Sequence, residues 1–220
     1  MSLKGSTEMV QEQQTRLWRP GPAEEGREAV LKAAADQFVR HGFNATSMDG
    51  IADALGSTKG RVYHYYRGKA EVFLDVAFHG MQDLLAMIDP VADDDSVPPS
   101  EQLSRMVHSH ALAMMQASNS QRVAVQLVQY RNAPELLSHR ETTDAIIALR
   151  RRYESRFVTV LQAGIESGEF AVTDASLAAK SLLGSLNWIP MWFRPGASSD
   201  EEMSRIAAFY RDTALRAVSA

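Results

Sequence analysis

A short basic and aromatic segment holds the residue types best suited to chemistry in this chain of 220 residues. Residues 56–69 read GSTKGRVYHYYRGK, with four cations, three tyrosines and a histidine but no acidic residue. Lysine and arginine neutralise phosphates and release counterions, while tyrosine and histidine add hydrogen-bonding groups for phosphates or base edges. The whole chain carries a formal net charge of −4, so this positive charge is concentrated locally. The segment indicates nucleic-acid binding, and a solvated basic helix surface is the alternative interpretation.

The elements that precede this segment are defined by helix-ending signals. From Glu24 the apolar residues recur at helix spacing, which predicts a first helix that ends at His41. Gly42 is expected to take the left-handed position after that helix, with Phe43 packed back on its last turn. Residues 1–23, rich in Gln, Glu, Pro and Gly, are predicted to be a flexible arm. Arg16, Arg19 and Arg27 either reach a minor groove from it or, as the favoured alternative, are incidental arginines of a disordered tail.

Capping residues place the basic segment on a short helix after a glycine turn. Thr46 or Ser47 is expected to cap a second helix that Gly56 ends, and Thr58 is expected to cap the third. Two short helices joined by a glycine turn have the geometry that puts the second helix into a DNA major groove. The four predicted N-terminal helices span about 24–41, 47–55, 59–66 and 69–88.

The rest of the chain is predicted to be helical as well. Asp89-Pro90 and Pro98-Pro99 are expected to break the pattern after the fourth helix. Further helices are predicted at about 101–117, 120–131, from Pro134, 139–167, 174–193 and 200–218. Because strand-like alternation is absent, the sequence predicts an all-α protein.

The sequence lacks the residues that several classes of function require. The absence of cysteine excludes disulfide scaffolds, thiolate metal sites and cysteine nucleophiles, and agrees with a cytoplasmic location. The six histidines show no metal-ligand spacing, and no HExxH, nucleophile or phosphate-loop motif occurs. No apolar run approaches about 18 residues, so no membrane partner is expected. We therefore expect no enzyme activity, no metal and no cofactor.

Residues 27–75 resemble the DNA-binding domain of the TetR family of regulators. The matching elements are Ala34 to Phe38, Gly42-Phe43, Thr46, Ile51-Ala52, Leu55-Gly56, Lys59-Gly60, Val62 to Tyr66 and Lys69. The pattern departs from the family at Ser57, usually apolar, and at Arg61, often small. The resemblance implies a helix-turn-helix domain over 24–70 and an effector-binding and dimerisation domain over 71–220.

The resemblance also implies which residues meet double-stranded operator DNA. Base reading is assigned to Lys59, Gly60, Arg61 and Tyr63. Contacts to the DNA backbone are assigned to Thr46, Ser47, Thr58, His64, Tyr65 and Lys69. Arginine and lysine suit guanine N7 and O6, and glycine permits close approach. Val62 and Tyr66 are expected to face the core instead.

In this family the C-terminal helices enclose an effector pocket and form a homodimer through the last two long helices. Segment 174–193 is apolar on more than one face, which independently indicates a helix buried on both sides. The candidate pocket residues are polar, soft or aromatic side chains within apolar helices: His110, Met114, Met115, Gln126, Tyr130, Phe157, Leu161, Trp188 and Trp192. Each of them has an ordinary core position as its alternative.

The chemistry of the effector is indicated only broadly. The residues around 164–170 and 188–196 are loosely similar to actinobacterial regulators of steroid and acyl-CoA breakdown, which implies a small hydrophobic or CoA-linked effector. Arg150-Arg151-Arg152 with Arg156 either attracts an anionic group of that effector or forms a solvated basic helix face. The expected function is a ligand-released repressor that binds a palindromic operator as a dimer. An activator, or a helical lipid or small-molecule carrier without sequence-specific DNA binding, remains as the alternative.

Overall fold

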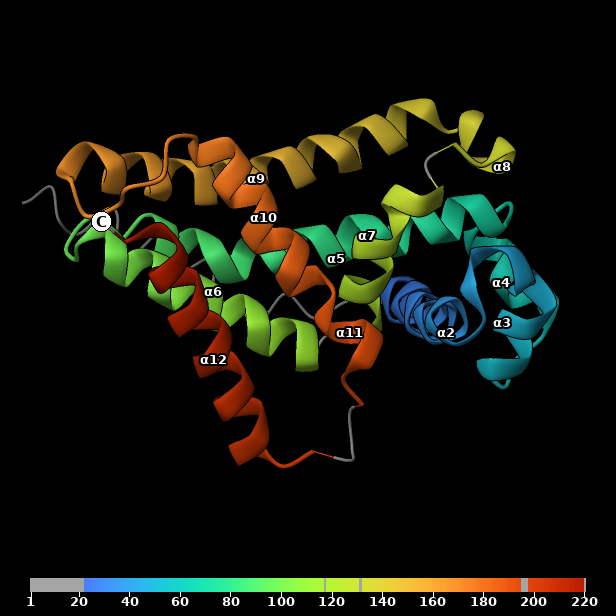
Figure 1. Ribbon diagram of the computed structural model, residues 1–220. Coiled ribbons are helices and arrows are strands. Elements are labelled where there is room, and N and C mark those ends of the chain that lie inside the picture. The colour runs from blue at the N-terminus through green and yellow to red at the C-terminus, as the bar shows by residue number, and fades with distance from the viewer. Residues whose placement is uncertain (1–21, 117, 131, 195–197, 220) are drawn as a thin grey trace, which may run out of the picture.

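The computed structural model describes residues 22–219 except 117, 131 and 195–197, and this part of the chain is all-α as predicted (Figure 1). Within it, extended pairing is limited to an isolated bridge between Phe170 and Ser219. No helix of the described part is long and apolar enough to span a membrane. The helices are α2 (Pro22–Ala45), α3 (Met48–Ala54), α4 (Lys59–Tyr65), α5 (Lys69–Ala92), α6 (Pro99–Gln116), α7 (Asn119–Tyr130), α8 (Pro134–Leu137), α9 (Arg140–Ser167), α10 (Ala175–Asn187), α11 (Ile189–Trp192) and α12 (Asp200–Val218).

Helices α2, α3 and α4 gather at one end of the molecule, and α5 runs from them into the larger helical part (Figure 1). Helix α5 packs against α2, α6, α7 and α9, while α12 packs on α6 and α10 on α9. The expected domain boundary at residue 70 falls in the first turn of α5. One continuous helix therefore belongs to both parts of the molecule.

The predicted turn glycines have the backbone conformations that the sequence requires. Gly42 and Gly56 have φ angles of 75° and 65°, a region that glycine enters without the steric cost of a Cβ. Phe43 is fully buried, and its ring centroid lies 6.2 Å from that of Phe38, as expected for packing back on the preceding turn. The helical assignment of α2 nevertheless continues past Gly42 to Ala45 across this kink.

Several predicted helix limits differ from those in the structure. Helix α2 begins at Pro22, because proline needs no N–H partner in the first turn of a helix. Helix α5 continues through Pro90 to Ala92 instead of ending at residue 88, because Pro90 lies in its last turn and interrupts little of the ladder. The predicted helix 174–193 is divided at Trp188 into α10 and α11, where Pro190 lacks a donor for a continuous helix.

An aromatic cluster joins α2, α5 and α7. Phe73 lies between Phe38 and Phe43, with ring centroids 4.9 Å and 4.7 Å away, and Tyr130 of α7 approaches Phe43 to 5.6 Å. The three phenylalanines are fully buried. Burying large aromatic side chains contributes several kcal/mol of hydrophobic stabilisation, about 1.5–3 kcal/mol each. The N-terminal helices are therefore fixed on the larger part by a common core.

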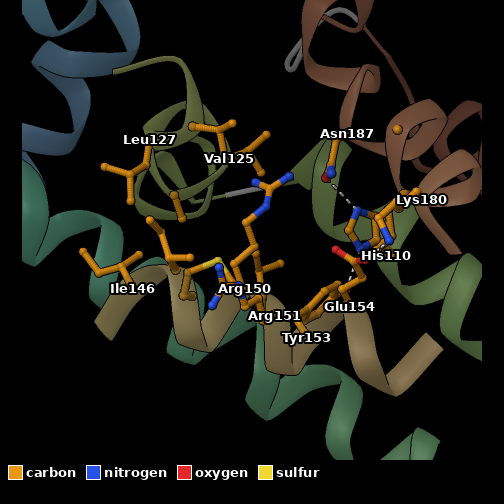
Figure 2. A pocket seen from close by; sticks show the side chains of 17 residues that line it. His110, Val125, Leu127, Ile146, Arg150, Arg151, Tyr153, Glu154, Lys180 and Asn187 are labelled. Atoms are coloured by element: carbon orange, nitrogen blue, oxygen red, sulfur yellow. Dashed lines mark hydrogen bonds and ion pairs between the residues drawn. The ribbon is translucent and has the colours of Figure 1, made fainter. Parts of the chain in front are cut away.

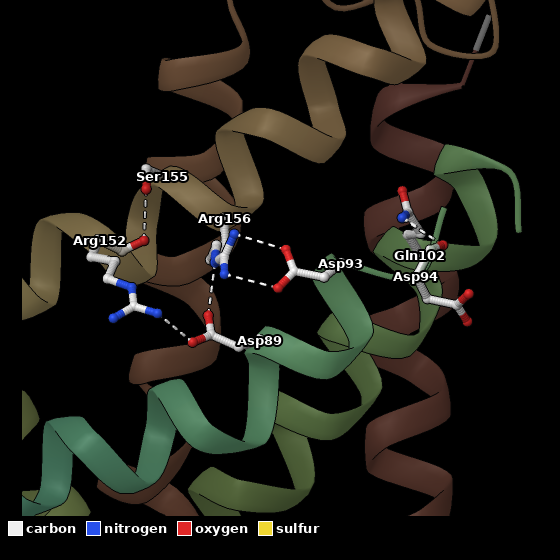
Figure 3. A network of polar contacts seen from close by, with 7 residues as sticks. All are labelled: Asp89, Asp93, Asp94, Gln102, Arg152, Ser155 and Arg156. Carbon is white, nitrogen blue, oxygen red and sulfur yellow. Dashed lines mark hydrogen bonds and ion pairs between the residues drawn. The ribbon is translucent and has the colours of Figure 1, made fainter. Parts of the chain in front are cut away.

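Ion pairs fix the far end of α5 to α9 (Figure 3). Arg156 of α9 donates from Nε to Asp89 at 2.7 Å and from Nη1 to Asp93 at 2.9 Å. Arg152, one turn earlier, donates to the other oxygen of Asp89 at 2.7 Å. Asp89 and the Arg156 side chain are only 23% and 26% exposed, so solvent screens this network less than a fully exposed pair.

Candidate DNA-binding surface and effector cavity

Helix α4 presents its basic and polar side chains outward. Val62 is fully buried and Tyr66, just after α4, is 3% exposed, so the expectation that both face the core is confirmed. Tyr63 is 51% exposed. The other exposed residues of α4 and its cap that the sequence assigns to DNA are Thr58, Lys59, Gly60, Arg61 and His64.

Charge pairing differs among the cations of this surface. The Lys59 ammonium contacts Asp49 of α3, and this hydrogen bond and ion pair raise the pKa of Lys59. Lys69 donates to the carbonyl of Asn44 at 3.2 Å, and its Nζ lies 4.5 Å from the centre of the Phe43 ring. The Arg61 guanidinium has no hydrogen-bond or ion-pair partner within the described chain. Arg61 is therefore the cation of α4 that needs no exchange of partners to meet a phosphate or base.

The capping residues around α3 take structural roles. Ser47 caps α3 by accepting from the N–H of Gly50 at 3.0 Å. Thr46 is only 4% exposed, and its hydroxyl donates to the carbonyl of Gly42 at 2.8 Å. The assignment of Thr46 to the DNA backbone thus conflicts with its burial. Tyr65 is half-buried, and its hydroxyl occupies the space beside Gly26 of α2.

A shared carboxylate connects the DNA-binding end to α5. Asp75 of α5 accepts from the Tyr66 hydroxyl at 2.6 Å and from Arg27 of α2 at 2.5 Å, and His79 lies 3.5 Å away. Burial and the neighbouring carboxylate raise the pKa of Tyr66, so it stays a neutral donor. Arg27 is therefore paired with α5, although its side chain is 44% exposed, and its contact with a minor groove stays a prediction. Arg16 and Arg19 lie outside the described residues.

The C-terminal part encloses a cavity of about 450 Å³, within the usual size range of small-molecule sites (Figure 2). Its walls come from α5, α6, α7, α9 and α10. The lining residues are Met81, Leu84, His110, Ala124, Val125, Leu127, Val128, Ile146, Ile147, Arg150, Arg151, Tyr153, Glu154, Lys180, Leu183, Gly184 and Asn187.

Of the predicted pocket residues, only His110 lines this cavity. Met114, Met115, Phe157 and Leu161 are buried in the core, which is the alternative that the sequence left open. Tyr130 belongs to the aromatic cluster with Phe43 and Phe73, and Gln126 lies on α7 outside the cavity lining. Trp188 and Trp192 are 61% and 45% exposed, because the break after α10 turns them away from the cavity.

A hydrogen-bonded chain of three side chains forms part of the cavity wall (Figure 2). His110 of α6 has its Nδ1 atom 2.5 Å from the Tyr153 hydroxyl of α9 and its Nε2 atom 3.2 Å from Oδ1 of Asn187 of α10. Burial lowers the pKa of His110 to about 4, so the imidazole is neutral near pH 7. The amide oxygen of Asn187 can only accept, so Nε2 carries the proton and Nδ1 accepts from Tyr153.

Charged side chains also line the cavity. Lys180 of α10 pairs with Glu154 of α9 at 2.9 Å, while Arg150 and Arg151 lie earlier on α9. The run of arginines noted in the sequence is thus divided, since Arg152 binds Asp89 of α5 instead. Tyr153, Glu154, Lys180 and Asn187 were missed as site residues. Tyr153 lies one helical turn before Phe157, so spacing along the long helix could have indicated it.

The comparisons with known proteins agree with this architecture. Residues 30–76 match the family of bacterial regulatory proteins, tetR family, and residues 96–218 match the tetracyclin repressor-like C-terminal domain. The transcriptional repressor KstR2 of Mycolicibacterium smegmatis is 25% identical over 185 residues, which cover 80% of this chain and 83% of that protein.

Solved structures show the same fold. A tetR-family regulatory protein from Rhodococcus RHA1 superimposes with a TM-score of 0.77 at 26% identity, over 91% of this chain and 99% of that one. The regulator AibR, solved with isovaleryl coenzyme A and operator DNA, has a TM-score of 0.71 at 23% identity, over 82% of this chain and 94% of AibR. The chain belongs to the TetR family of DNA-binding transcriptional regulators, which are not enzymes.

Proposed function

We propose that this protein is a ligand-responsive repressor that binds a palindromic operator as a homodimer and is released by a small hydrophobic or CoA-linked effector. The observation that carries the proposal is the course of α5. This helix starts at Lys69 beside the exposed basic helix α4, and its Met81 and Leu84 line the cavity. A group bound in the cavity would touch the element that supports the DNA-binding end.

The proposed dimer uses the outer face of α10, α11 and α12. Five large apolar side chains on these helices are substantially exposed: Leu177, Trp188, Met191, Trp192 and Phe209. Large exposed apolar surfaces are typical of interaction sites. A two-fold dimer presents two copies of α4 to successive major grooves, so its operator is a palindrome with half-sites about one helical turn apart.

The DNA contacts follow from which side chains are exposed. We assign base reading to Lys59, Gly60, Arg61 and Tyr63 and leave the phosphates to the polar groups around them. Those backbone-contacting residues are Ser47, Thr58, His64, Tyr65 and Lys69, and Thr46 is omitted because its hydroxyl is used inside the fold.

The switch is a two-state equilibrium of the dimer. The effector would favour an arrangement of the two α4 helices that no longer fits the operator, and it can shift the equilibrium only by its difference in affinity for the two states. The isovaleryl coenzyme A of AibR supports the CoA-linked class, because a ligand of that kind is held by a regulator with this fold. We place the protein in the cytoplasm, where its operator lies.

Selection of bound sequences from a random DNA library, read by gel shift, tests the DNA-binding part. Recovery of a palindrome supports a dimeric sequence reader, whereas recovery of only random sequence would favour a carrier without sequence-specific binding. A reporter under the selected operator then separates repression from activation.

Replacing Arg61 tests the base contacts on that selected operator. Arg61→Ala should cost about 1–3 kcal/mol of binding free energy and relax specificity at one base pair, because its unpaired guanidinium is available for a guanine edge. The control is Arg216→Ala, which removes an exposed arginine from the last turn of α12, a helix that lies away from α4 (Figure 1). Uniform weakening on every sequence would make Arg61 a phosphate contact instead.

A further inference from the structure

The cavity is mostly apolar, but its wall includes one fully connected polar chain. Tyr153, His110 and Asn187 come from three different helices, and all three line the cavity. His110 is 1% exposed. Burying polar groups costs free energy unless they are hydrogen-bonded, so an apolar pocket needs no such chain for packing alone. Its position at the cavity wall suggests a role in ligand recognition.

The direction of the chain decides what it can offer to a ligand. A neutral imidazole has one donor and one acceptor, so the Tyr153 hydroxyl donates to Nδ1 and His110 donates to Oδ1 of Asn187. Both ring nitrogens of His110 are therefore occupied within the chain and are not available to a ligand. The amide nitrogen of Asn187 is left without a hydrogen-bond partner among the described residues, and it is not sealed from solvent. Asn187 is thus the end of the chain that presents N–H donors.

The charges beside the chain cancel. Lys180 and Glu154 lie next to His110 in Figure 2 and pair with each other at 2.9 Å. Arg150 and Arg151 lie on the preceding turn of α9 and also line the cavity. An anion placed against His110 and Asn187 would lose its hydration, and the adjacent cation, Lys180, is already paired with Glu154. An uncharged acceptor fits these surroundings better.

We propose that Asn187, held in place by His110 and Tyr153, determines specificity by donating a hydrogen bond to a carbonyl oxygen on an otherwise apolar effector. The assignment rests on the proposed function, since it requires an effector in this cavity. Asn187 is the last residue of α10, immediately before the break at Trp188. A carbonyl bound to Asn187 would lie next to α11, whose exposed apolar residues the proposed dimer buries.

Two probes of the same shape test the assignment: 2-acetylnaphthalene, with a carbonyl, and 2-isopropenylnaphthalene, in which a CH₂ group replaces the oxygen. Both are titrated calorimetrically into the full-length protein. The wild type should prefer the ketone once the difference in their water-to-octanol transfer is subtracted. Asn187→Leu should reduce this preference by about fivefold to tenfold, the equivalent of one net hydrogen bond, and leave the affinity for the hydrocarbon nearly unchanged.

Gln162→Leu is the matched control, because it makes the same change from an amide to leucine at an exposed position of α9 outside the cavity lining. It should keep the preference for the ketone, and thermal melts verify that both variants fold. An unchanged preference in Asn187→Leu, or an equal loss in Gln162→Leu, would overturn the assignment to Asn187. If the wild type binds neither probe, or if filling the cavity by Leu183→Trp leaves their binding intact, the cavity itself fails as the effector site and the proposed function fails with it.

Discussion

Gly80 of α5 lies so close to the backbone of α7 that no room is left for a Cβ atom. A Cβ atom at this position would stand 2.2 Å from the carbonyl oxygen of Ser120, 2.5 Å from its carbonyl carbon and 2.9 Å from the nitrogen of Gln121. All three are backbone atoms, which no rotamer change can move. The Gly80→Ala variant therefore forces the start of α7 away from α5.

Two opposing effects determine the sign of the stability change. Alanine favours the helix over glycine by about 1 kcal/mol in a helix interior. Restoring normal contact distances needs a helix displacement of about 1 Å, and overpacking of this kind costs typically about 1–3 kcal/mol. Because the obstacle is backbone, we expect the upper part of this range and a net loss of about 1–2 kcal/mol. For a chain of this size, that lowers the Tm by about 2–8 °C.

Thermal and urea denaturation of the full-length protein measure this difference. Gly50→Ala on α3 is the matched control, because its Cβ would meet its nearest neighbours, the Ser47 hydroxyl and Gln37, at the ordinary distances of 3.4 Å and 3.6 Å. The control should be neutral or stabilised by up to about 1 kcal/mol. A Gly80→Ala protein that melts at or above the wild-type temperature would refute the close approach of α5 and α7.

Three further perturbations follow from the charged groups. Arg156→Gln breaks the pairs with Asp89 of α5 and with Asp93 just after it, and should cost about 1 kcal/mol of unfolding free energy, less at high salt. Arg151→Gln should cost almost nothing, and urea titrations at two salt concentrations measure both variants. The buried His110 has a pKa of about 4, against 6.5 in the unfolded chain, so the unfolded state takes up the proton first as the pH falls. The free energy of unfolding should therefore decrease by about 3 kcal/mol as the pH drops from 6.5 to 4. A His110→Gln protein should lack this part of the loss. Asp49→Asn releases Lys59 and removes a negative charge from the surface proposed for DNA, so gel shifts at low salt should show tighter operator binding, and equal or weaker binding would count against this surface.

The DNA-binding end could be predicted from the sequence because its signals are local. Gly42 and Gly56 mark turns by needing positive φ, and Ser47 marks the start of α3 by its side-chain oxygen. These properties depend on neighbours within a few residues. The capping pattern alone did not separate Thr46 from Ser47, because two adjacent hydroxyl residues satisfy it equally; in the structure the Thr46 hydroxyl donates to the carbonyl of Gly42 in α2.

The limits of the C-terminal helices depended on weaker signals. Pro90 ends a helix by the usual rule, yet α5 continues for two residues beyond it and its final turn is held to α9 by the arginine–aspartate network. Trp188 shows no local break signal of its own, because the donor missing from the helix is two residues later, at Pro190. Tertiary contacts therefore accompany the end of α5, whereas the break after α10 follows from a proline that lies two residues beyond it.

The cavity shows why pocket residues are harder to predict than a core. His110 and Met114 are one turn apart on the same face of α6, and the sequence treats them alike. Both side chains are buried, but of the two only His110 lines the cavity, and it bonds to residues that follow it by 43 and 77 positions. Periodicity identifies the inward face of a helix. A cavity, however, forms where five helices leave space unfilled, and its location depends on how those helices are positioned relative to one another. Polar residues on inward faces are the useful signal, because burial without a partner is costly; by that criterion His110, Tyr153 and Asn187 stand apart from the methionines and phenylalanines around them.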